Sequence, residues 1–174
     1  MFERTLEGRE RALGAAHPNT LAAMSNLAIV LLEQGEHAEA RDRFSKALQA
    51  QEQALGAAHQ STLLTLTNRG EAQRRMGEAA AAEADLRRAL AGLQTALGGR
   101  HQITLYAVAT LSLLLLQRGH VEEAAAVYAD ALQGEPLGPQ DPDTVKNIDQ
   151  LSQLLRERGD GEAAAQLRER FGCE

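Results

Sequence analysis

One stretch of 16 residues occurs three times along this chain at a fixed interval. LGAAHPNTLAAMSNLA begins at Leu13, LGAAHQSTLLTLTNRG begins at Leu55, and LGGRHQITLYAVATLS begins at Leu97, so each copy follows the last by 42 residues. A shorter copy, GEPLGPQDPDTV, follows with two residues deleted, and its Thr144 corresponds to Thr104. A repeat of this length predicts an array of stacked supersecondary units.

Each unit is predicted to form two helices. The first helix, over residues 20–34, has apolar residues at a helical period, namely Leu21, Met24, Leu27, Ala28, Leu31 and Leu32. Pro18 suits the first turn of a helix, and Gly35 is placed to end it. The second helix, over residues 38–55, also carries an apolar side: Ala40, Phe44, Ala47, Leu48 and Leu55. A single hairpin cannot bury both apolar sides, so the sequence predicts an all-α fold, an α-solenoid of antiparallel helix pairs.

The period divides the chain into five segments. Residues 1–19 form a partial repeat, consisting of a second helix and its loop, because residues 2–17 align with residues 44–59. Repeats follow at 20–61, 62–103 and 104–143, and a capping repeat at 144–174 ends in the charged segment LRERFGCE. A polar last helix is typical of a cap. For the other end we expect either a longer array that was cut or an orphan helix.

Composition argues against several classes of function. The formal net charge is −6, which disfavours binding to nucleic acid or to an anionic membrane surface. Cys173 is the single cysteine, so no internal disulfide can form. No apolar stretch is long enough to cross a bilayer. We therefore expect a cytoplasmic protein.

The sequence offers no residues with a clear catalytic role. His17, His59 and His101 recur every 42 residues, but equivalent positions in successive repeats are too far apart to share a metal ion. We interpret these histidines as packing where helices begin. No hydrolase, zinc-protease or phosphate-loop signature is present. The sequence therefore predicts neither an enzyme nor a metal or cofactor site.

The helix pairs resemble a known repeat family. Its pattern of L-G-x2-Y and A-x3-F is matched by Leu27-Ala28-x2-Leu31 and Ala40-x3-Phe44. The 42-residue length, with ALG..HP.T between units and NLA in the first helix, resembles the kinesin light chain type of tetratricopeptide repeat. The resemblance implies a right-handed superhelix whose first helices line a concave face, on which a peptide or helix of a protein partner binds. The Ala-, Arg- and Gly-rich composition suits a bacterium.

The resemblance places several side chains in that groove. The candidate groove residues are Asn26, Ile29, Asn68, Arg75, Tyr106, Leu113, Leu116 and Lys146. An asparagine amide can donate to a peptide carbonyl and accept from a peptide N–H at once. The alternative for Asn26 and Asn68 is a surface amide bonded to water. Thr110 and Gln150 stand at the corresponding positions of the later repeats, so the asparagine row is incomplete.

The segment LYAVATLSLLLL is apolar on nearly all sides, which is typical of a buried helix. Leu111, Leu114 and Leu115 fit the stripe inside the solenoid. Leu113 and Leu116 are left to form an apolar floor to the groove, or else to pack against the next repeat.

Two functions follow as expectations. The first is a non-enzymatic module that binds a peptide or helix of a protein partner in the concave groove. The alternative is self-association, as a homo-oligomer formed through the N-terminal helix with Phe2 and Leu6, within a larger signalling protein.

Overall fold

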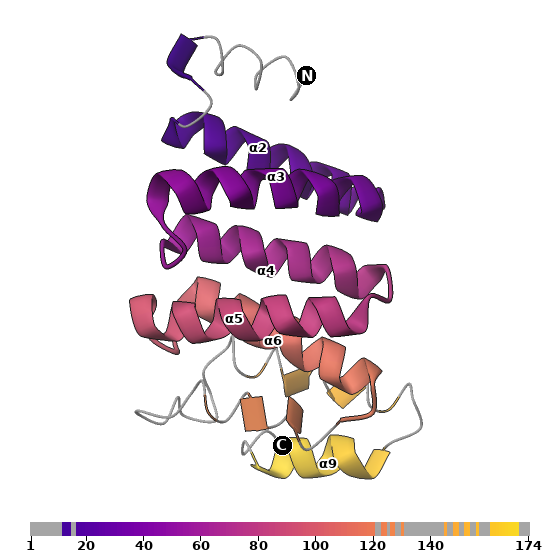
Figure 1. The fold of residues 1–174 in the computed structure, drawn as a ribbon. Coiled ribbons are helices and arrows are strands. Elements are labelled where there is room, and N and C mark those ends of the chain that lie inside the picture. The colour runs from indigo at the N-terminus through magenta and orange to yellow at the C-terminus, as the bar shows by residue number, and fades with distance from the viewer. Residues whose placement is uncertain are drawn as a thin grey trace. The chain divides into compact units, whose positions relative to one another are not determined.

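The computed structural model describes residues 12–14, 17–120, 123–124, 126–127, 130, 145, 148–149, 152–153, 156 and 161–170. Its described elements are all helices: α2 (Pro18–Glu33), α3 (His37–Leu55), α4 (Gln60–Arg75), α5 (Ala79–Leu97), α6 (Gln102–Gln117) and α9 (Gly161–Arg170) (Figure 1). The first residues of α2, α4 and α6 are 42 positions apart, as the repeat predicted. The chain divides into two compact units, Met1–Ala107 and Val108–Glu174.

Local sequence determines where the first helix pair begins and ends. Pro18 occupies the first turn of α2, where a missing N–H costs nothing. Gly35 follows α2 with φ +85°, a conformation that favours glycine because no Cβ clashes there. The N–H of Glu36 then donates to the carbonyl of Leu31 at 2.9 Å, and that of Gly35 to Leu32 at 3.2 Å. This pair of bonds is a Schellman ending, and it turns the chain directly into α3.

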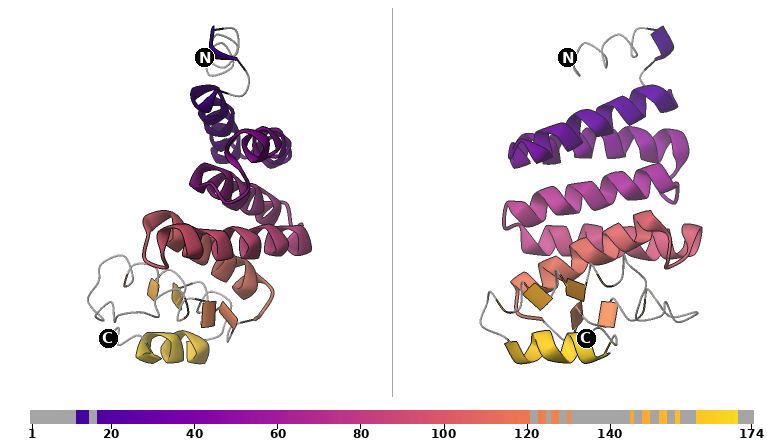
Figure 2. Two further views of the ribbon diagram at one scale, coloured as in Figure 1. Left: turned by 60° about the vertical axis from the view of Figure 1, so that its left-hand side comes forward. Right: turned by 180° about the vertical axis from the view of Figure 1, so that it is seen from behind.

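In the first unit each helix packs on the next one along the chain. Contacts join α2 to α3, α3 to α4 and α4 to α5, and α2 also touches α4 (Figure 2). Ala28 and Leu32 of α2, Ala40 and Phe44 of α3, and Ala72 of α4 form one buried cluster. Because Ala72 belongs to the second helix pair, the first pair completes its core only by stacking on its neighbour.

The predicted apolar stripes are confirmed for the most part. Leu21, Leu27, Ala28 and Leu32 of α2 and Ala40, Phe44, Ala47 and Leu48 of α3 are buried. Met24, Leu31 and Leu55 are half-buried. The stripe predicted for α6, Leu111, Leu114 and Leu115, is also buried.

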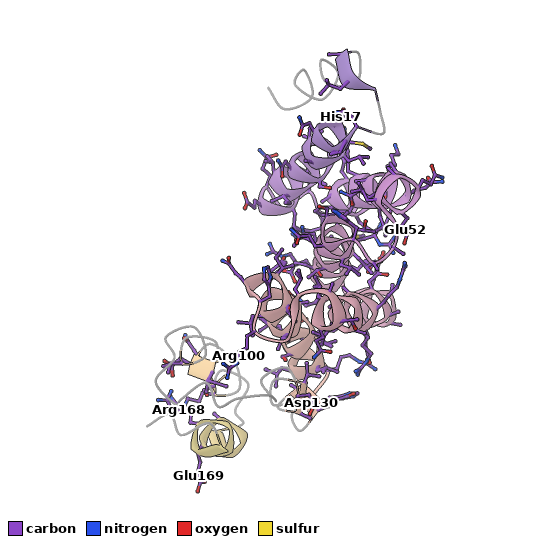
Figure 3. All side chains as sticks on the ribbon, turned by 90° about the vertical axis from the view of Figure 1, so that its left-hand side faces the viewer. His17, Glu52, Arg100, Asp130, Arg168 and Glu169 are labelled. Carbon is purple, nitrogen blue, oxygen red and sulfur yellow. The ribbon has the colours of Figure 1, made fainter. Side chains whose placement is uncertain are left out.

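Ion pairs link successive helix pairs on the outside of the first unit. Arg41 of α3 contacts Glu78 before α5 at 2.7 Å, and Glu52 of α3 (labelled in Figure 3) contacts Arg88 of α5 at 2.6 Å. These side chains are roughly a third to a half exposed, so each pair contributes little to stability. Core packing therefore holds the stack together.

Among the residues that the structure describes, no helix has the length and apolar content needed to cross a membrane.

Candidate functional site

Four of the polar residues near the C-terminal end of helix α4 form a group that we call the α4 polar row: Asn68, Glu71, Arg74 and Arg75. Spacings of three, four and seven residues place Asn68, Glu71 and Arg75 on one side of a helix. Asn68 and Glu71 are each 6% exposed, while the Arg75 side chain is 42% exposed. The row therefore passes from a buried amide and carboxylate to an exposed guanidinium.

Asn68 is held by a residue of the following first helix. The Tyr106 hydroxyl of α6 donates to Oδ1 of Asn68 at 3.0 Å. Tyr106 is 38% exposed, and it is one of the two large hydrophobic residues of the described chain that are exposed. The bond orients the amide, because its acceptor oxygen faces Tyr106 and its NH2 group is directed to the other side. No described residue accepts a hydrogen bond from that NH2 group.

Glu71 is buried and held by two arginines. Nε and Nη2 of Arg74 donate to its two carboxylate oxygens at 2.7 and 2.8 Å, and Nε of Arg75 donates to Oε1 at 2.6 Å. Burial by itself raises the pKa of Glu71. The hydrogen bonds from the two arginines lower that pKa by more than burial raises it, so the pKa lies below its ordinary value. The carboxylate therefore stays ionised and keeps both guanidinium groups in place.

Asn26 and Ile29 occupy the corresponding positions of α2. Asn26 is exposed, in contrast to Asn68, and Ile29 is half-buried against the cluster of Ala28 and Phe44. Helices α2 and α4 are in contact, and α4 is joined to α6 through Asn68 and Tyr106. Five of the eight predicted groove residues, Asn26, Ile29, Asn68, Arg75 and Tyr106, thus belong to three successive first helices of the first unit.

Two other predicted groove residues, Leu113 and Leu116, are placed differently from these five. Leu113 is half-buried and Leu116 is only 4% exposed, and both belong to the second unit. Leu116 therefore does not contribute an exposed apolar floor. Neighbouring side chains cover this position of α6, which the sequence of one helix could not reveal. Lys146 lies outside the described residues.

A buried polar network beneath α2 and α4 was missed from the sequence. The hydroxyls of Ser25 on α2 and Thr65 on α4 are 3.0 Å apart, and the Gln51 amide of α3 donates to Ser25 Oγ at 3.2 Å. All three residues are at most 9% exposed. Leu93 stands at the position of Gln51 in the next helix pair. A polar residue where the next repeat has a leucine was the signal in the sequence that could have indicated this network.

The three repeated histidines have a defined local role. Nδ1 of each histidine (His17, His59 and His101) accepts a hydrogen bond from the backbone N–H two residues later in the chain, each at 3.2 Å. His17 and His59 are the N-cap residues of α2 and α4. No group of three or more metal-ligating side chains occurs within the described part of the chain.

Comparisons with known proteins agree with this architecture. A family model described as tetratricopeptide repeat matches residues 1–53 and 25–95. A search of curated proteins found no significant match. Two structures described as putative kinesin light chain nearly identical TPR-like repeats, from Podosopora anserina, are 22% identical. They cover 98% of this chain and 81% and 82% of their own, with TM-scores of 0.80 and 0.78.

A third structure, BtubC (BKLC) from P. vanneervenii, is 19% identical and covers 98% of this chain and 69% of its own, with a TM-score of 0.77. At these identities the likeness establishes the fold, an all-α solenoid. Such arrays serve as scaffolds for protein–protein interaction, and are typically not catalytic. From its repeats and its fold, this chain belongs to the tetratricopeptide repeat family.

Proposed function

We propose that the chain is a non-enzymatic module that binds a peptide or helix of a protein partner on the face made by α2, α4 and the beginning of α6. The groove residues of this proposal are Asn26, Ile29, Asn68, Arg75 and Tyr106. The orientation of Asn68 by Tyr106 carries the proposal. A buried amide held on one side leaves its NH2 group for a partner's carbonyl, whereas a surface amide bonded only to water would be mobile.

Two further features support this face. Tyr106 combines a 38% exposed aromatic ring with a polar end, a combination that is enriched in protein interfaces. Arg75 donates to Glu71 through Nε, and its guanidinium retains further N–H donors at an exposed position. The face thus offers donors and one aromatic ring, which suit the carbonyl groups and apolar side chains of a bound segment.

Selection of binding peptides from a random display library tests the proposal. Selected peptides are then titrated against the wild-type chain and against Asn68→Ala. The matched control is Gln53→Ala, at an exposed position of α3. We expect Asn68→Ala to weaken binding by about tenfold, the effect of losing one buried hydrogen bond, and Gln53→Ala to leave it unchanged. Binding that is equally strong in Asn68→Ala, or failure to select any peptide, would overturn the proposal.

Self-association is the second candidate function. Phe2 and Leu6, on which it was predicted to depend, lie outside the described residues, but Leu13 nearby is 45% exposed. Light scattering over a hundredfold range of concentration separates the candidates, since a peptide-binding monomer keeps a mass near 18.7 kDa. A mass that rises with concentration in the wild type but not in Leu13→Asp would favour self-association. The cytoplasmic location and the bacterial origin stay predictions.

A further inference from the structure

The contact between the first helix pair (α2 and α3) and the second pair (α4 and α5), which we call the first stacking interface, contains polar links that the next repeat does not reproduce. The hydroxyls of Ser25 and Thr65 are 3.0 Å apart across it, and Gln51 donates to Ser25. One repeat later the corresponding residues are Thr67, Ala107 and Leu93. All six residues are at most 9% exposed, so equivalent buried positions are polar at one level of the stack and largely apolar at the next.

Two ion pairs cross the same interface nearer the solvent. Arg41 contacts Glu78 at 2.7 Å, and Glu52 contacts Arg88 at 2.6 Å. One repeat later, the residues at the positions of Glu78 and Arg88 are His120 and Asp130. The third repeat therefore lacks both of the charges that the second pair offers to the first.

The repeat makes the second and third repeats alternative neighbours for the first helix pair. Units of a repeat array have similar shapes, so misassembly of units and their exchange between two copies of a chain are characteristic failures of such proteins. A unit in the wrong place would present its own equivalent residues at the first stacking interface. The residues that differ between the two levels therefore discriminate between the two neighbours.

The third repeat matches the first helix pair poorly. Ala107 would stand in place of Thr65, so Ser25 would lose the hydroxyl that it meets across the interface. Asp130 would face Glu52, so two carboxylates would lie where the native stack has an ion pair. The wrong neighbour thus loses a buried hydrogen bond and turns an attraction into a repulsion.

We propose that these polar links select the neighbour of the first helix pair: they favour α4 and α5 over the third repeat, whether that repeat belongs to the same chain or to a second copy. Exposed ion pairs add little to stability, but charges discriminate when an attraction to one partner becomes a repulsion from another. A buried polar group can fix register in the same way. The property concerns assembly of the stack and does not depend on the proposed binding face.

The test uses a variant in which both kinds of discrimination are removed. It carries four substitutions: Ser25→Ala, Gln51→Leu, Thr65→Ala and Asp130→Arg. The first three make the network apolar, so neither neighbour leaves one of its polar groups unpaired. The fourth gives the third repeat the charge that Arg88 supplies in the second. Glu33→Arg is the matched control, because it makes the same change of charge at an exposed position of α2.

Each protein is unfolded in urea, refolded at high concentration and diluted, and its mass is then measured by light scattering. Chains that have exchanged repeats stay joined after dilution, because separating them requires unfolding, whereas reversible self-association disappears. We expect the wild type and Glu33→Arg to recover the mass measured before unfolding. The fourfold variant should contain at least about tenfold more persistent oligomer, the product of few-fold effects of one hydrogen bond and of the charge pairs. Equal amounts in the wild type and the fourfold variant would overturn the proposal.

Asp130→Arg alone provides a second test, which leaves every residue of the first stacking interface unchanged and does not require the fourfold variant to fold. It should form a few-fold more persistent oligomer than Glu33→Arg, and an equal amount would overturn the proposal. Far-UV circular dichroism of the oligomer should show the helix content of the monomer, because exchange keeps every helix. A lower helix content would identify the oligomer as aggregated unfolded chain and would contradict the proposal.

Discussion

Arg69 of α4 and Asp85 of α5 form an ion pair. In the neighbouring repeats a leucine stands at the position of Arg69. Leu27 and Leu111 correspond to Arg69, and Val127 corresponds to Asp85 in the third repeat. Nε and Nη2 of Arg69 donate to the two oxygens of Asp85 at 2.7 and 2.8 Å. We predict that breaking this pair destabilises the protein, and that replacing both partners by their apolar equivalents does not.

The magnitude follows from the exposure of the two side chains, 22% for Arg69 and 13% for Asp85. Breaking a fully buried pair costs about 3–5 kcal/mol, whereas an exposed pair contributes about 0–1 kcal/mol. This pair lies between these limits, so Arg69→Leu and Asp85→Val should each cost about 2 kcal/mol, because each leaves one charge without its partner. The double variant should lie within about 1 kcal/mol of the wild type, since no unpaired charge remains.

Urea unfolding of the four proteins, followed by far-UV circular dichroism, forms a double-mutant cycle. Leucine is a good helix former, and valine and aspartate have similar helix propensities, so backbone effects are small. Costs that simply add in the double variant would contradict this prediction, because they would show that the two side chains stabilise the protein independently. Single variants as stable as the wild type would show that solvent screens the pair.

Two other predictions concern α4. Gly70→Ala should lower the free energy of unfolding by about 1 kcal/mol. A Cβ at this position would lie 2.7 Å from Cγ of Leu86, and the resulting strain outweighs the gain in helix propensity. An unchanged urea midpoint would contradict this prediction. Glu71→Gln should cost about 2 kcal/mol near neutral pH, because the charge-assisted bonds from Arg74 and Arg75 are lost. The folded-state pKa of Glu71 is lowered, so its contribution is present above the ordinary carboxyl pKa of about 4.3 and disappears as the pH falls through the lowered value. Urea midpoints of wild type and Glu71→Gln should therefore converge only in strongly acidic buffer, and convergence already near pH 5 would show that the arginines do not stabilise the carboxylate.

Much of the candidate face could be anticipated from the repeat, but its chemistry could not. The period places Asn26 and Asn68 at equivalent positions, yet one is exposed and the other is buried under the hydroxyl of Tyr106. Ala22 and Leu64 stand at the position of Tyr106 in the earlier repeats. Only the tyrosine can donate a hydrogen bond to the asparagine on the first helix of the preceding pair, which explains the difference. A helix pattern describes one helix, whereas this contact depends on which side chain the next helix presents.

Features that depend on neighbours along the chain could be predicted from the sequence. Pro18, Gly35 and Gly56 mark helix ends because backbone dihedral angles and hydrogen bonds are local, and the apolar stripe of Ala40, Phe44 and Ala47 follows from helical periodicity.

Packing between helices determines the burial of Leu116, the role of Gln51 in a network with Ser25, and the binding of Glu71 by two arginines. These depend on how much water the surrounding helices exclude and on which rotamers they leave available. Local sequence therefore specifies the helix pairs, and the stacking of those pairs decides which of their polar groups remain accessible to a partner.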